Sequence, residues 1–523
     1  MEAKIYDNIP KEKFQFAKKE GFGHDEKLST KPRSYMRDAF SRFCKNKGSV
    51  VAAVIILFML LFAIIVPFCT PYTVAYEDTL FAYALPKNPM FEKTSFWDGC
   101  SKKEQGAADF NYYYFMGEET GHYAIKNQKY KYDEKSKLYT YRLDSYQMKG
   151  CYFRQISAEE YENIQKYQDE TGIQVLYPTI KLTDRAPESQ VGSDRQANIY
   201  YKHALSGTQV KPVLDANGNV QPIYWQDKGE NLADNYHSKR IEGENGFKVG
   251  NDTYYYVYAR GVAGGDVEVR LNNYEYYVYN HTYVLKDGIK KPMFLFGSTH
   301  VGKDILVCLA SGARFSFIFA ISVSLVNMFL GAIYGAIEGY YGGKIDLILE
   351  RISDILAAVP SMIVITLLKY HLGASLSPVL ILFIAFVATG WIGMAGSTRM
   401  QFYRYKNQEY VLAARTLGAK DRRLMWKHIF PNSLGTLITG SALVIPAMIF
   451  SETSLSYLGI INLSTGNITS VGTLIAAGQP YMVNFPHMVA FPSVFLALLM
   501  LCFNLFGNGL RDAFNPSLRG SEG

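Results

Sequence analysis

The residues of this 523-residue chain that could carry out chemistry do not assemble into a nucleotide-binding or hydrolytic motif. A P-loop follows the pattern G-x-x-x-x-G-K-[ST], because backbone N–H groups and the lysine must hold the phosphates. The nearest stretch, residues 342–345, lacks the first glycine and the hydroxyl. The polar middle of the chain contains neither H-E-x-x-H nor G-x-S-x-G. The sequence therefore predicts no ATPase or peptidase site and no bound cofactor in this chain.

The cysteines do not indicate a metal or redox site. No two of them form a C-x-x-C pair, so neither zinc binding nor dithiol chemistry is predicted. Cys100 and Cys151 both lie in the polar middle of the chain and could form a disulfide if that region is extracytoplasmic. Two unpaired thiols are the alternative. The six are Cys44, Cys69, Cys100, Cys151, Cys308 and Cys502.

Glu452 is an unusual charged residue because it follows an apolar run, residues 443–450, near the outer end of an expected span. A carboxylate at membrane depth costs free energy, so it indicates a partner group or a water-lined path. We expect Glu452 to line an external gate; a position at the membrane–water interface is the alternative. Glu350, Arg351 and Asp354 have a simpler explanation, since residues three apart pair at the end of a helix.

A polar stretch, residues 409–432, separates two long apolar segments. Val411, Ala414 and Leu417 fall three residues apart, which predicts a short helix with one apolar stripe. Gly418 can adopt the left-handed conformation that ends a helix. A helix this short cannot bury a core of its own, so it must dock onto another surface.

The second half of this stretch is basic. A second short helix is expected to begin at Lys420 or Asp421, and Pro431 is expected to stop it. The five cations of the whole stretch are Arg415, Lys420, Arg422, Arg423 and Lys427.

Six apolar segments are expected to position these residues. Each is close to the length that crosses a bilayer as a helix, about 20 residues. Gly331, Gly335 and Gly339 recur every four residues in the second segment, which lets another helix approach closely. An even number of spans puts both termini on one side. The segments are residues 50–68, 315–341, 355–368 with an extension back to 345, 376–394, 434–450 and 488–505.

The distribution of Lys and Arg predicts the orientation. Residues 1–48 are rich in basic residues and lack the apolar core of a signal peptide. The loop 461–487 has no Lys or Arg, so the positive-inside rule places it outside and both termini in the cytoplasm. We therefore expect cytoplasmic tails at 1–48 and 513–523 of a plasma-membrane protein. A first span at 49–70 and a five-span core at 297–512 complete the arrangement.

Residues 72–296 are expected to form a separate external domain. They contain 29 of the 40 tyrosines, and a disordered segment would be poor in aromatics. Alternating Tyr and Val predict a β-rich α+β fold. A helix is predicted at 158–170, with Ser157 and Glu160 at capping-box spacing and Gly172 as its stop. The predicted strands are 129–132, 138–143, 253–260, 267–271 and 274–285. The net charge of +7 does not indicate nucleic acid, because the cations flank the apolar segments.

The stretch 409–432 resembles the "EAA" coupling loop of ABC importer permeases. Ala413 and Ala414 match, Gly418 is in place, and Pro431 lies at the proper distance. Leu412 departs from the pattern, because the family usually has Glu there. His428 and Phe430 also replace the usual Ile and Leu.

Other stretches extend the resemblance to the dipeptide/oligopeptide importers, and to their second, C-type permease subunit. This resemblance implies the six-helix type I importer permease fold, with residues 72–296 as an insertion in the first external loop. The matching stretches are 296–304, 311–316, 339–343, 454–459, 504–512 and 515–519.

The resemblance also implies the partners and the mechanism. They are a homologous B-type permease subunit, two cytoplasmic ATPases that use ATP, and an external peptide-binding lipoprotein. The coupling helix would sit in a groove of one ATPase and transmit its closure to the spans. The residues expected to do so are Ala413, Ala414, Arg415, Gly418 and Pro431.

Several alternatives stay open from the sequence. An importer for nickel or another small solute would share this permease, and a membrane-anchored receptor or adhesion protein belongs to a different functional class. The inserted domain has two interpretations. It either clamps the peptide-binding protein onto the permease or serves as an adhesive module without a role in transport.

Overall fold

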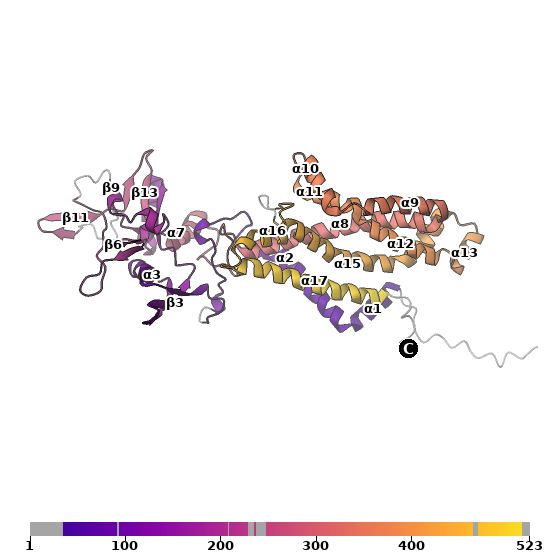
Figure 1. Cartoon of the computed structure of the whole chain (residues 1–523), viewed down its shortest axis with the longest axis horizontal. Coiled ribbons are helices and arrows are strands. Elements are labelled where there is room, and N and C mark those ends of the chain that lie inside the picture. Colours follow the sequence, from indigo (N-terminus) through magenta and orange to yellow (C-terminus); the bar gives the residue numbers. More distant parts are fainter. Residues whose placement is uncertain are drawn as a thin grey trace, which may run out of the picture.

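The computed structural model describes residues 35–91, 94–207, 209–228, 235–236, 247–463 and 469–514. Most of the predicted N-terminal tail and most of the C-terminal tail, including the stretch 515–519, lie outside these residues. The described chain forms a helical bundle with a separate, strand-containing domain at one end (Figure 1).

The bundle is built from long apolar helices. Five helices of the described chain are long and apolar enough to cross a membrane. A sixth span exists only if α9, Gly343–Ala357, and α10, Ser361–Leu372, are taken together, because they are bent by 71°. Pro360 precedes α10 and cannot continue a helix, which explains the break. The others are α2 Lys47–Cys69, α8 Ile305–Tyr341, α11 Pro378–Gly390 with α12 Ile392–Tyr405, α15 Phe430–Tyr457 and α17 His487–Phe514.

The prediction of a mainly α membrane protein is therefore confirmed, with the third span as a bent pair. Helix α2 shows why such segments suit a membrane. Its small residues Ala52 and Ala63 are buried in the bundle, while Phe58 and Phe68 point outward. An apolar outer surface of this kind is compatible with lipid and not with water.

The two ends of the bundle carry different parts of the chain (Figure 1). The inserted domain covers one end. The other end holds α13, Glu409–Thr416, together with α1, Tyr35–Lys45, and the last turns of α17. Both ends of the described chain thus lie on the side of the 409–432 loop.

The described residues of the inserted domain form four small antiparallel sheets. In the first, β3 Leu138–Asp144 lies between β1 Cys100–Gln105 and β2 Ile125–Asp133. In the largest, β13 Val267–Asn272 pairs with β4 Cys151–Ile156, and Val269 lies opposite Arg154. The remaining strands are β12 Ala259–Gly261, β9 Asn235–Tyr236 and β5 Leu176–Tyr177 of that sheet; β10 Phe247–Val249, β11 Asp252–Tyr256 and β8 Gln226–Asp227; and β6 His203–Ser206 with β7 Gln209–Pro212.

Helices complete this domain. The predicted helix is confirmed as α4, Ala158–Thr171, with the Ser157 hydroxyl accepting from the Glu160 amide and Gly172 in the left-handed conformation. The predicted strand 274–285 is wrong. This segment forms α7, Asn273–Tyr279, followed by the π-helix η7, Asn280–Leu285. The Asn272 side chain accepts from two amides of the first turn and so starts a helix here.

A buried ion pair connects the largest sheet of the domain to a helix outside that sheet. Arg270 on β13 is fully buried and binds Glu119, at the end of α3 Ala107–Thr120, through both carboxylate oxygens at 2.5 Å. The Tyr224 hydroxyl donates to the same carboxylate at 2.8 Å. Bidentate geometry and a further donor compensate for the cost of burying these charges.

Aromatic side chains fix the root of the inserted domain to the bundle. Tyr72 follows the end of α2 and Phe294 lies in the segment that leads back to α8, and the two rings lie 5.1 Å apart. The Tyr72 hydroxyl also lies 3.0 Å from that of Tyr277 on α7. Trp97 stacks on Phe296 and on Phe491 of α17. The domain is therefore packed directly against the bundle and is not connected to it by flexible linkers alone.

Candidate functional site

The 409–432 loop is built on a packed apolar base. Val411 of α13 is fully buried. It lies in one cluster with Ala336 and Tyr340 of α8 and Phe402 of α12. Three residues from the second half of the loop complete this cluster: Leu424, Met425 and Ile429. The loop is thus held by the adjacent ends of two spans.

The opposite side of α13 is open. Leu412 and Ala413 are exposed, and Leu417 is 88% exposed. The predicted stripe is therefore correct for Val411 and Ala414 but wrong for Leu417. Gly418 explains this difference: with φ of +83° it ends the helix, and the chain turns before Leu417 reaches the base. An apolar side chain at this tip remains available for a partner.

The second half of the loop runs directly into the next span. The short helix α14, Asp421–Arg423, is followed by the π-helix η8, Leu424–Ile429, and then by α15. The prediction that Pro431 stops a helix is wrong, because Pro431 lies in the first turn of α15. Proline lacks an N–H and crowds the preceding turn. The wider hydrogen-bonding pattern of a π turn accommodates it without ending the helix.

Three hydrogen bonds set the angle between the halves of the loop. The Tyr340 hydroxyl donates to Asp421 at 2.6 Å, and Arg415 donates to the same hydroxyl at 3.5 Å. Asn432 donates to the Tyr410 hydroxyl at 3.2 Å. The sequence pattern indicated Asp421 only as a possible helix start and did not single out Tyr340. The stretch 339–343, which contributed to the resemblance, contains Tyr340 and was the available signal.

A basic groove runs along the second half of the loop. Its cations are not buried, and Trp426 contributes an apolar wall. Such a surface attracts anionic groups at a distance. The groove is lined by Lys420, Arg422, Arg423, Trp426, Lys427 and Pro431.

Arg399 clamps α12 to α9 near the same end. Its guanidinium binds Asp346 at 2.6 and 2.9 Å and Glu350 at 2.7 and 3.0 Å. Tyr403 donates to Asp346 at 2.5 Å. The predicted pair of Arg351 with Asp354 is present at 3.3 Å. Glu350, however, binds Arg399, which the sequence analysis did not identify.

The three glycines of α8 lie against α12. A Cβ at Gly331 would come within 2.7 Å of the Trp391 carbonyl oxygen, and one at Gly339 within 2.7 Å of that of Arg399. A Cβ at Gly335 would meet the carbonyl oxygen of Ala395. Since the obstacles are backbone atoms, no rotamer change could make room for a side chain.

Glu452 is fully buried near the C-terminal end of α15. It accepts hydrogen bonds from Ser316 of α8 at 3.1 Å and from Ser456, one turn later, at 3.0 Å. The Ser470 side chain, which caps α16 Val471–Gly478, also contacts it. The carboxylate therefore joins three helices within the bundle. It faces protein hydroxyls, as a buried polar group must.

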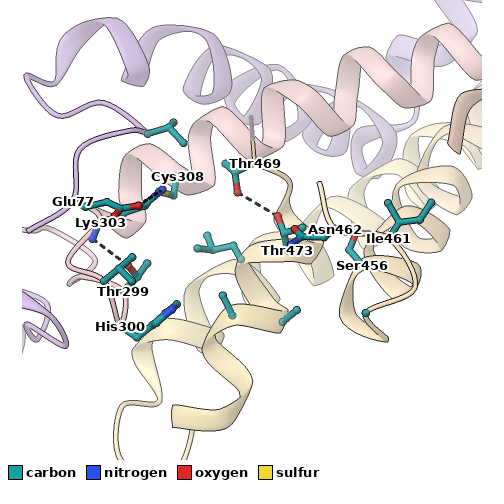
Figure 2. Close-up of a pocket in the computed structure, with 16 residues that line it drawn as sticks. Glu77, Thr299, His300, Lys303, Cys308, Ser456, Ile461, Asn462, Thr469 and Thr473 are labelled. Atoms are coloured by element: carbon teal, nitrogen blue, oxygen red, sulfur yellow. Dashed lines mark hydrogen bonds and ion pairs between the residues drawn. The ribbon is translucent and has the colours of Figure 1, made fainter. Parts of the chain in front are cut away.

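A cavity of about 510 Å³ opens beside this junction (Figure 2). Ser456 lines it and so lies between the cavity and Glu452. Lys303 and Glu77 form an ion pair of 3.1 Å at its other end. Its other polar lining residues include Thr299, His300, Asn462, Thr469 and Thr473.

The cysteines of the inserted domain are free thiols in the structure. Cys100 begins β1 and Cys151 begins β4, so they belong to different sheets. Burial raises the pKa of each thiol to about 12, which keeps both protonated and poorly nucleophilic. Among the described residues, no three His, Cys, Asp or Glu side chains form a possible metal site.

Two family matches cover the bundle. Residues 327–520 match the family described as the binding-protein-dependent transport system inner membrane component. Residues 34–86 match the N-terminal TM domain of oligopeptide transport permease C. Together they take in the first span, most of the other spans and the 409–432 loop, and they leave most of the inserted domain unmatched.

Individual relatives agree with these matches. The chain is 42% identical to the oligopeptide transport system permease protein OppC of Bacillus subtilis over 43% of this chain and 72% of the relative. It is 37% identical to the dipeptide transport system permease protein DppC of the same organism, over 43% and 69%. Among solved structures, the MetNI methionine ABC transporter shares 14% identity, with a TM-score of 0.31, over 39% of this chain and 96% of that chain.

The matched residues are those that build the bundle and its loop. The identity to OppC extends over most of that relative's length. This chain belongs to the family of binding-protein-dependent inner-membrane transport permeases, with the C-type permeases of oligopeptide and dipeptide importers.

Proposed function

We propose that this chain is the C-type permease subunit of an ABC importer for peptides. The observation that carries the proposal is that the 409–432 loop has one side packed on the spans and the other side exposed. Val411 and Ile429 fix it to the ends of the spans, while Leu412 and Leu417 stay open to a partner. A rigid base with an exposed apolar tip suits a part that transmits force between subunits.

The partner at this loop is one of two cytoplasmic ATPase subunits. These subunits bind and hydrolyse ATP, and the present chain supplies no catalytic residue or cofactor. The second half of the path comes from a homologous B-type permease. Ala413, Arg415 and Gly418 contact the ATPase, Ala414 packs on the base beneath them, and Pro431 passes the motion into α15. Leu412 is exposed, so a glutamate there would not be forced into the base.

The loop end of the bundle faces the cytoplasm of a plasma membrane. Both termini of the described chain lie at that end, as expected of an even number of spans. The basic groove around Arg422 and Lys427 supports this orientation, because cytoplasmic loops are rich in Lys and Arg. The inserted domain then lies outside the cell.

The external domain docks the peptide-binding lipoprotein onto the permease. Its support is the fixed root at Tyr72, Phe294 and Trp97, which would hold a docked partner over the path. A variant without residues 75–292 should bind the lipoprotein more weakly than the intact complex. Undiminished affinity in surface plasmon resonance would discard docking in favour of an adhesive role.

Glu452 controls the external end of the path. Its carboxylate ties α8 to α15 and α16 beside the cavity, so opening there must rearrange its bonds to Ser316 and Ser456. Glu452→Gln should change both peptide uptake and the ATPase rate stimulated by the binding protein. Unchanged values of both would rule this role out.

The main test uses the complete complex in proteoliposomes, with ATP inside and a labelled peptide outside. Leu417→Asp should abolish ATP-dependent uptake while the permease pair still assembles, because only the exposed tip is altered. Leu205→Asp is the matched control, since Leu205 is an exposed leucine of the inserted domain. Normal uptake by Leu417→Asp would contradict the proposed coupling. Uptake of nickel in place of peptide would contradict the proposal that the substrate is a peptide.

A further inference from the structure

The base of the inserted domain exposes a group of large apolar side chains. Met90 is 87% exposed and Phe96 is 68% exposed; Phe91 follows Met90 in the chain, is also exposed, and its ring lies 6.1 Å from that of Phe96. Side chains of this kind gathered on one surface indicate an interaction site. We name Met90, Phe91 and Phe96 the apolar rim.

Trp97 holds the apolar rim in place. Its ring stacks on Phe91 at 6.1 Å and meets Phe96 edge-on at 5.7 Å. The indole N–H donates to the Leu295 carbonyl at 2.6 Å, in the segment that leads to α8. Trp97 therefore anchors the apolar rim to the segment that leads into the bundle.

The rim continues the apolar surface of a membrane span. Trp97 stacks on Phe491, in the second turn of α17. A groove of about 360 Å³ lies between the two segments and is lined by Phe96, Trp97, Pro486 and Phe491. Farther along α17 the exposed residues include the apolar Val494, Leu498, Leu501 and Leu505, with Asn504 as an exposed polar residue near the far end. An apolar surface thus runs from Leu501 and Val494 of α17 to the base of the inserted domain.

We propose that the apolar rim lies in the lipid–water interface of the bilayer, on the side of the inserted domain, and contacts phospholipid. Aromatic side chains with one polar group, such as Trp97, prefer this interface. Met and Phe side chains beside them gain by leaving water for the upper acyl chains. The occupant is lipid because the rim is continuous with α17. The proposal requires only that α17 spans the membrane.

The test uses Trp97 as a reporter in the full-length chain. Trp225→Phe, Trp391→Phe and Trp426→Phe leave it as the single tryptophan of the sequence. The chain is reconstituted in phosphatidylcholine–phosphatidylglycerol vesicles that carry bromine at a shallow or a deep acyl position. We expect loss of Trp97 fluorescence, greater with the shallow bromine. A chain that retains only Trp225, in the inserted domain, is the control and should keep its fluorescence.

A second variant tests the rim itself. Met90→Glu with Phe96→Glu in the Trp97-only chain should reduce the quenching, whereas Leu205→Glu, at another exposed site, should not. An unquenched Trp97, or equal quenching with and without the two glutamates, would overturn the proposal. Quenching that disappears when the partner permease is added would also overturn it, because the rim would then be a protein interface.

Discussion

The Tyr340 hydroxyl donates a hydrogen bond of 2.6 Å to the carboxylate of Asp421 and thereby joins the end of α8 to the start of α14. Tyr340→Phe removes this bond and keeps the ring in the base of the loop. We expect a loss of about 1 kcal/mol in stability and fewer peptides imported per ATP. Thermal unfolding and the uptake-to-hydrolysis ratio measure the two effects. Tyr341→Phe, at an exposed neighbouring ring, should change neither.

Gly418 sets the turn at the tip of the loop with a φ of +83° and open space around it. Gly418→Val forces a β-branched residue into the left-handed region, at a cost of roughly 1–2 kcal/mol. We expect ATP hydrolysis to continue in the assembled complex while peptide uptake falls. Gly418→Asn should retain uptake, because asparagine tolerates this conformation. Equal coupling by the valine and asparagine variants would show that the turn is not needed.

The contact between α8 and α12 depends on Gly335. Gly335→Ala places a methyl group against the backbone of Ala395, so the helices must separate. Overpacking of this kind costs about 1–3 kcal/mol, and the melting temperature in detergent should fall. Gly393→Ala provides the matched control on α12, where a Cβ meets open space. That variant should be neutral or slightly more stable, since alanine favours a helix.

Arg270 and Glu119 form a charge pair inside the inserted domain. Glu119→Gln leaves the guanidinium buried without its counter-charge, which costs about 3–5 kcal/mol. Limited proteolysis should then cleave the domain at a lower temperature. Glu104→Gln breaks the exposed pair with Lys102 and should have little effect. Similar protease resistance in both variants would contradict the importance of the buried pair.

Asp98 gives the inserted domain a dependence on pH. Burial raises the pKa of its carboxyl, but hydrogen bonds from Lys126 and the Cys100 amide and the charge of Arg142 outweigh it and hold the pKa below its usual value. The folded pKa is thus lower than the unfolded one, about 3.9. The resulting stabilisation is complete above the unfolded pKa and is lost as the pH falls through the folded pKa.

An acid titration of the Trp97-only chain in detergent measures this loss, because Trp97 directly precedes Asp98. In Asp98→Asn the corresponding acid transition should be absent. Glu134→Gln, at an exposed position, should keep it. A transition that persists unchanged in Asp98→Asn would assign it to another carboxylate.

The spans and the loop could be predicted because they follow local rules. Apolar length marks the spans, and the capping residues of α4 lie beside the helix that they cap. Pro431 and Leu417 were misjudged because the neighbouring turns decide their roles: a π turn before Pro431 and the turn at Gly418. Neither conformation follows from the residue types alone.

The inserted domain shows a further limit of predicting structure from the sequence. The segment after Asn272 has the Tyr and Val content of a strand, yet it forms α7, because Tyr276 and Tyr279 pack in the same core at helical spacing. Tertiary contacts override propensity in this way. The partners of Glu452 and Arg399 come from helices distant in the sequence, so no spacing rule could identify them.

The contact between Tyr72 and Phe294 also bears on how such a chain can fold. The cost in chain entropy of an insertion depends on holding its two ends together. Here the rings at the two ends of the insertion are in contact. The bundle therefore has the two ends fixed close together, whatever the length of the inserted chain between them. Domains whose ends meet in this way can be gained or lost with little disturbance to their host. A permease can therefore acquire a domain of this size without changing the order in which its helices fold and pack.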